Sequence, residues 1–189
     1  QPRRTIRFML WSGEEQGLLG SKAYIEQHPE EMERISAVLV HDGGTNYLSG
    51  INATPLLMPI FEEVLEPVDR MVANYEDDEM KFRIRAVDSV PLGIGSDHDS
   101  YLRRGVPGFF WNQAGESNYT YVHHTQHDVY ENAVARYEEH SAKVIAMTAW
   151  RLANTEQMLP REDLLDPNRS NNRSSRNRRM LGVFLDETD

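Results

Sequence analysis

Apolar residues occur along the chain in runs that predict buried strands separated by amphipathic helices. Three mainly apolar runs, at residues 6–11, 35–40 and 106–111, predict strands that are covered on both faces, as in the centre of a parallel sheet. A shorter strand is predicted at residues 82–86. Apolar side chains at helical spacing predict a helix from residue 18 to the proline at 29, and further helices at 56–68 and 137–158. We therefore expect an open α/β sheet.

Polar clusters follow these strands or lie in loops near them. Two carboxylates follow the first strand, an aspartate and two glycines follow the second, and a glycine-led turn with an Asp-His pair precedes the third. A polar loop after the third strand contains three histidines within five residues. In an open sheet the carboxyl ends of the strands share one edge, so these side chains can converge there. The residues concerned are Glu14, Glu15, Asp42, Asp97, His98, His123 and His124.

Composition narrows the chemistry that such a cluster can perform. The 189 residues include 30 acidic and 20 basic ones and no cysteine. A net charge of −10 argues against a nucleic-acid partner, which would require a basic patch. No run approaches the roughly 18 apolar residues of a membrane span. Without thiolates, a metal must be held by histidine and carboxylate, and that donor set suits catalytic zinc.

Each cluster also has a simpler explanation. Glu14 and Glu15 can open a helix, where the helix dipole favours negative charge. The three histidines of residues 123–127 can be the chance content of a polar loop. Spacing alone therefore leaves the metal site and a plain structural role as open alternatives.

The chain also resembles a known family. The run Trp-Ser-Gly-Glu-Glu-Gln-Gly-Leu-Leu-Gly-Ser at 11–21 is similar to the double-glutamate signature of the co-catalytic di-zinc aminopeptidases, metallopeptidase family twenty-eight. Relatives of that family include glutamate carboxypeptidase and glutaminyl cyclase. Asp42 after a strand, Gly-Ser-Asp-His at 95–98 and Tyr-Val-His-His-Thr at 121–125 match its later motifs in order. The resemblance covers residues 1–158 and implies a three-layer α/β/α sandwich with a mixed, mainly parallel sheet.

The resemblance also implies a role for each residue. Glu14 is expected to be the general base, and Glu15 and His124 ligands of one zinc ion. Asp42 is expected to bind a second zinc. Asp97, His98 and His123 are expected to line the substrate pocket.

One departure limits these expectations. The family takes two further zinc ligands, a His and an Asp, from a segment before the double glutamate, and residues 1–13 contain neither. We therefore expect this chain to be the C-terminal part of a catalytic domain, truncated at the N-terminal side and inactive alone. The expected function is hydrolysis of a peptide by a zinc exopeptidase that releases an N-terminal residue. A non-catalytic binding module of the same fold is the alternative, and a glutaminyl cyclase ranks below both.

The tail differs from the rest in composition. Residues 161–179 are rich in Asn, Ser and Arg, which predicts a polar linker after a domain of residues 1–160. Residues 180–189 resemble the opening strand of a PDZ domain, with a plain C-terminal strand as the alternative. Relatives are often exported, which favours a periplasmic or extracellular location. Oligomeric state does not follow from the sequence.

Overall fold

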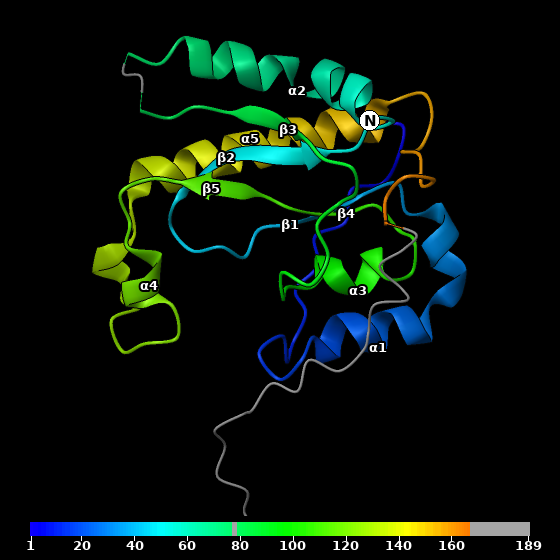
Figure 1. Cartoon of the computed structure of the whole chain (residues 1–189), viewed down its shortest axis with the longest axis horizontal. Coiled ribbons are helices and arrows are strands. Elements are labelled where there is room, and N and C mark those ends of the chain that lie inside the picture. Colours follow the sequence, from blue (N-terminus) through cyan, green and yellow to red (C-terminus); the bar gives the residue numbers. More distant parts are fainter. Residues whose placement is uncertain (77–78, 167–189) are drawn as a thin grey trace, which may run out of the picture.

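Two adjacent β-sheets, one of two strands and one of three, form the middle layer of the structure (Figure 1), a computed structural model that describes residues 1–76 and 79–166. Strand β1 (Val38–Val40) pairs in parallel with β4 (Gly108–Phe110). Strand β2 (Tyr47–Ala53) pairs in parallel with β3 (Arg83–Ala86) and antiparallel with β5 (Asn112–Ala114). Only Trp111 separates β4 from β5, so one stretch of chain joins the two ladders. The predicted mixed, mainly parallel sheet is confirmed.

Helices cover both faces of this layer (Figure 1). One face carries α2 (Met58–Ala73) and α5 (Ala135–Asn154), and the other carries α3 (His98–Leu102), against which α1 (Leu19–Gln27) packs. Three short helical turns complete the fold: η1 (Pro29–Arg34), α4 (Tyr119–Val122) and η2 (Tyr130–Asn132). Within the described residues, no helix is both long and apolar enough to cross a membrane.

The main core lies between the sheet and the layer of α2 and α5. Phe61 of α2 meets Phe109 of β4 edge-on, with ring centroids 5.2 Å apart. Val144 and Leu152 of α5 are buried in the same cluster, as the predicted inward face of this helix requires. Burial of these apolar side chains supplies most of the driving force for folding. The sandwich thereby fixes the strand ends from which the polar clusters project.

The predicted strand at residues 6–11 does not form. This segment makes no β-ladder with any strand of the described chain, and Phe8 and Leu10 are 95% and 102% exposed. Trp11 is the exception, since its ring packs near Tyr101 at 5.7 Å. An apolar run becomes a buried strand only where neighbouring strands bond to its backbone and cover its side chains. Among the described residues, no strand pairs with residues 6–10, and only Ile6 and Met9 of this segment are partly covered.

Two further differences concern β2 and the segment after α5. Strand β2 was not predicted, because Ser49, Gly50 and Asn52 interrupt its apolar pattern, yet most of it is buried. Residues 161–166, which the composition assigned to the linker, pack on the domain. Leu164 is buried in the main core, and Val90 N donates a hydrogen bond to its carbonyl. The rest of the predicted linker, 167–179, and the PDZ-like segment, 180–189, lie outside the described residues.

Candidate functional site

The double glutamate lies in a tight loop that glycines make possible. Gly13 and Gly17 adopt positive φ angles of 67° and 104°, which side chains disfavour. The amides of Gly17 and Leu18 both donate to the Glu14 carbonyl, at 2.9 and 2.8 Å. This turn leaves Glu14 half-buried and Glu15 exposed. The two adjacent carboxylates therefore occupy different environments, as two different roles would require.

A close backbone contact fastens this loop to α1. The Gly20 amide donates to the Ser12 carbonyl at 2.8 Å. A Cβ atom at Gly20 would lie 2.6 Å from that same oxygen and 2.7 Å from Ser12 N. Only glycine allows the start of α1 to approach the chain this closely. The close contact with Ser12 thus explains why the motif has glycine at position 20.

Asp42 leaves the carboxyl end of β1 and is held by a residue that the sequence analysis did not single out. Ser96 Oγ donates to Asp42 Oδ2 at 2.5 Å, and Ser96 is buried. The bond fixes one oxygen of Asp42 and joins the strand end to the turn before α3. The Gly-Ser-Asp-His motif contains the signal for this contact, because a small hydroxyl directly precedes Asp97.

His124 reaches Glu15 from the loop after α4. Its Nε2 lies 2.8 Å from Glu15 Oε1, although the two residues are 109 positions apart. His124 has a positive φ of 58°, which is uncommon for a residue with a side chain. Thr125 holds this reversal, because its hydroxyl donates to the carbonyls of Tyr121 and Val122 at 2.7 and 3.1 Å.

The predicted catalytic and metal residues converge around Glu14. Partial burial raises the pKa of Glu14, the carboxylates of Asp42, Glu15 and Asp97 raise it further, and His124 opposes them. These electrostatic neighbours come from four segments that lie on one side of the molecule in Figure 1: the loop before α1, the end of β1, the start of α3 and the loop after α4. A carboxylate whose pKa lies above its usual value is a better proton acceptor at neutral pH.

Asp97 and His98 lie deeper than the other members. Asp97 is buried, its Oδ1 has no hydrogen-bond partner among the described residues, and burial raises its pKa. His98 is fully buried beside Phe110, with ring centroids 5.4 Å apart, and burial lowers its pKa. The neighbouring Asp99 accepts hydrogen bonds from the amides of Gly93 and Gly95 and so shapes the turn. A substrate-pocket role for Asp97 and His98 stays a prediction.

The donor chemistry at this site fits zinc in part. Glu15 and His124 present a carboxylate oxygen and an imidazole nitrogen side by side, and their side chains are 61% and 58% exposed. Both donor types are usual for zinc. No three histidine or carboxylate side chains of residues 1–76 and 79–166 are grouped closely enough to hold an ion. The described residues therefore offer two adjacent donors and a third, Asp42, nearby.

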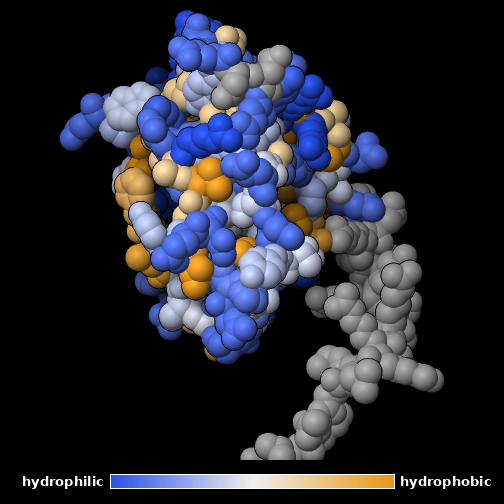
Figure 2. All heavy atoms as spheres, turned by 90° about the vertical axis from the view of Figure 1, so that its left-hand side faces the viewer, coloured by the Kyte–Doolittle hydropathy of each residue, from blue (hydrophilic) through white to orange (hydrophobic). Residues whose placement is uncertain are grey.

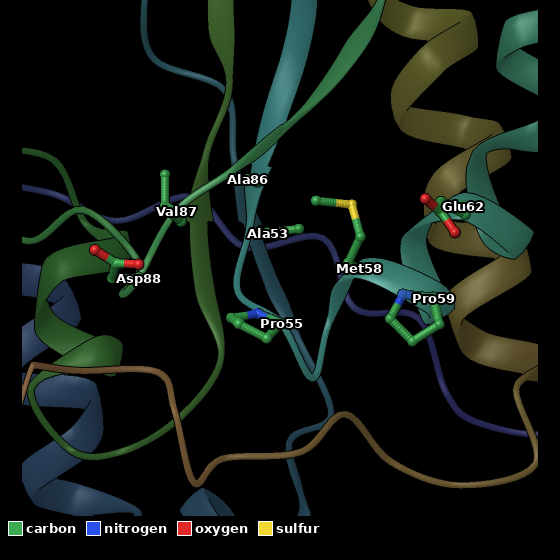
Figure 3. Close-up of a pocket in the computed structure, with 8 residues that line it drawn as sticks. All are labelled: Ala53, Pro55, Met58, Pro59, Glu62, Ala86, Val87 and Asp88. Carbon is green, nitrogen blue, oxygen red and sulfur yellow. The ribbon is translucent and has the colours of Figure 1, made fainter.

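A separate cavity of about 500 Å³ lies at the opposite edge of the sheet (Figure 3). It opens where β2 and β3 end, between Ala53, Ala86 and the start of α2. Its charged lining residues are Glu62 and Asp88, and it contains none of the predicted site residues.

The side of the molecule that carries α4 is mainly hydrophilic with scattered apolar spots (Figure 2). At the candidate site, Glu15 and His124 are exposed to solvent, whereas Glu14 is half-buried and Asp97 is buried.

Known proteins share sequence and fold with most of this chain. The family profile of Peptidase family M28 matches residues 1–149. Carboxypeptidase Q of Xenopus laevis is 31% identical over 85% of this chain, and a probable leucine aminopeptidase of Arthroderma benhamiae is 29% identical over 79%. The matches cover 32% and 39% of those proteins, so this chain spans about a third of their length. A crystal structure of a peptidase M28 precursor from Shewanella amazonensis superposes with a TM-score of 0.68 at 26% identity, covering 85% of this chain and 34% of that one.

Proposed function

Because this chain belongs to peptidase family M28, we propose that it carries the general base and part of the metal site of a zinc-dependent exopeptidase. The convergence of Asp42, Glu15 and His124 around a half-buried Glu14 carries the proposal. Its substrate is a peptide, from which it removes an N-terminal residue.

In this proposal Glu14 performs the proton transfers. It accepts a proton from the water that attacks the scissile carbonyl carbon, and it returns that proton to the nitrogen that leaves. The neighbouring carboxylates and partial burial favour this role, because they raise the pKa of Glu14. Glu15, Asp42 and His124 would hold zinc, which supplies Lewis acidity for the scissile carbonyl. Ser96 keeps Asp42 oriented through its hydrogen bond.

The test separates the base from the ligands. In the complete protein, Glu14→Gln should retain zinc and lose turnover by about 10²–10⁴-fold, which is the usual contribution of a general base. Glu15→Ala should lose zinc from one site. Glu26→Gln, the same change at an exposed residue of α1, is the control and should retain both zinc and turnover. Near-normal turnover in Glu14→Gln would refute the assignment of the base.

A second candidate concerns which end of the peptide is released. The matched relative from Xenopus laevis is named carboxypeptidase Q, whereas the one from Arthroderma benhamiae is a probable leucine aminopeptidase. Dipeptides with a blocked amino end and dipeptides with a blocked carboxyl end distinguish the two activities. Cleavage only of substrates with a free amine supports the aminopeptidase. Cleavage of amine-blocked dipeptides favours the carboxypeptidase, and no cleavage by zinc-loaded protein favours a binding module.

A further inference from the structure

Three rings form a stacked column next to the double glutamate. The rings of Tyr119 and His123 are parallel within 20°, with centroids 4.6 Å apart. The rings of His123 and His124 follow at 3.8 Å and 27°. His124, the last ring, contacts Glu15 through Nε2. His123, predicted as a pocket residue, is thus placed between an aromatic ring and the predicted zinc ligand.

The first ring of the column rests on the turn that follows Asp42. A Cβ atom at Gly44 would lie 3.2 and 3.3 Å from Cδ2 and Cε2 of Tyr119. Burial raises the pKa of Tyr119, and the carboxylates of Asp42, Glu15 and Glu14 raise it further, which agrees with its place beside them. The column therefore connects the Asp42 turn with the His124–Glu15 pair.

We propose that Tyr119 is a positioning residue whose ring, acting through His123, orients the His124 imidazole toward Glu15. The need for such support follows from the surroundings of His124. Its side chain is 58% exposed, so packing against the rest of the fold restrains the imidazole little. A flat ring stacked at 3.8 Å restricts rotation of the imidazole while leaving Nε2 free to meet its partner. The sequence signal is a tyrosine four residues before the first histidine of the His-His-Thr motif.

The same helix provides a matched control. Tyr121 stacks on His127 with centroids 4.2 Å apart and rings within 15°. Tyr119 and Tyr121 are similarly exposed, at 40% and 50%. The second stack contains no residue of the candidate site. Its removal therefore measures the effect of losing a Tyr–His stack from α4 without changing the support of His124.

The experiment compares Tyr119→Ala, Tyr119→Phe and Tyr121→Ala in the full chain. The first readout needs no metal: a long-range ¹H–¹⁵N NMR spectrum reports the tautomer and ring shifts of His124. Tyr119→Ala should shift the His124 ring signals, whereas Tyr119→Phe, which retains the ring, and Tyr121→Ala should leave them in place. Unchanged His124 signals in Tyr119→Ala would overturn the proposal.

The second readout is zinc affinity in the complete protein, and this part rests on the proposed function. Tyr119→Ala should weaken zinc binding by about 10–100-fold, as loss of a group that orients a ligand commonly does. His123→Phe should retain the stack and the affinity. Equal loss in His123→Phe and His123→Ala would make His123 a ligand and refute its role as a spacer. If the unmodified protein binds no zinc, the proposed function fails, while the NMR spectra still decide the role of Tyr119.

Discussion

The contact between Gly20 and Ser12 gives a prediction in which two effects have opposite signs. Gly20 is the second residue of α1, and in a helix alanine is intrinsically better than glycine by up to about 1 kcal/mol. Propensity alone therefore predicts that Gly20→Ala stabilises the protein. The structure predicts the reverse, since the new Cβ would lie 2.6 Å from Ser12 O and 2.7 Å from Ser12 N.

The steric effect should exceed the propensity effect. Both close atoms belong to the backbone, so no side-chain rotation relieves the contact, and overpacking of this kind costs about 1–3 kcal/mol. Separation of the two segments also weakens the hydrogen bond from Gly20 N to Ser12 O, worth about 1 kcal/mol. After subtraction of the propensity gain, the net loss is about 1–3 kcal/mol. For a protein of this size that lowers Tm by roughly 2–12 °C.

Chemical denaturation of Gly20→Ala, of the control Ala23→Gly and of the unmodified chain measures the three free energies of unfolding. Ala23→Gly, at an exposed position of the same helix, calibrates the propensity effect without any steric contact. We expect both substitutions to destabilise the protein, although they exchange the same two residues in opposite directions. A gain in stability for Gly20→Ala that matches the loss for Ala23→Gly would refute the steric argument.

Three other predictions concern His140, Thr125 and Ser96. His140 lies between the Tyr75 hydroxyl and the Leu48 carbonyl, and burial lowers its pKa. The stability that this shift contributes is present above the unfolded pKa of about 6.5 and is lost as pH falls below it. His140→Gln should therefore flatten the decline in unfolding free energy between pH 7 and 5, and an unchanged slope would contradict this. Thr125→Val removes the hydroxyl bonds that hold the loop, so we expect proteolysis after α4 to accelerate while the midpoint of global unfolding stays within a few degrees. Ser96→Ala removes the donor to Asp42 and should weaken zinc binding in the complete protein by about 10–100-fold, measured by chelator competition; equal affinity would show that Asp42 needs no such support.

The strand ends were predictable because apolar runs and the polar residues after them are local signals. The runs ending before His41 and before Asn112 both contain strands, β1 and β4, and α3 begins at the Asp-His pair. The run at residues 6–11 has the same apolar pattern but no strand partner in the described chain. Burial of a strand depends on its neighbours, and a pattern within the segment does not contain that information.

Residue type and motif order predicted which residues would approach one another. Glu15 and His124 lie 2.8 Å apart and both act on the pKa of Glu14, whereas the catalytic and metal-binding roles stay predictions. The supporting contacts were not predicted, since each depends on tertiary distances that no spacing reveals. The hydrogen bond from Ser96 to Asp42 joins residues that are 54 positions apart. The support from Tyr119 depends on how its ring is oriented against His123.

The contact between Glu15 and His124 also bears on how the domain unfolds. These residues are 109 positions apart, so a link between them closes a loop that contains β1 to β5 and helices α1 to α4. Closing a loop of about 100 residues with a covalent cross-link is worth up to about 4.7 kcal/mol, because it removes disorder from the unfolded chain. Unlike a covalent cross-link, an ion or inhibitor that binds both side chains only in the folded state would stabilise the domain by mass action, by about 2.7 kcal/mol at one hundred times its Kd. The free energy of unfolding of the whole domain, including strands that the ligand does not contact, would then depend on whether the exposed Glu15–His124 pair is occupied.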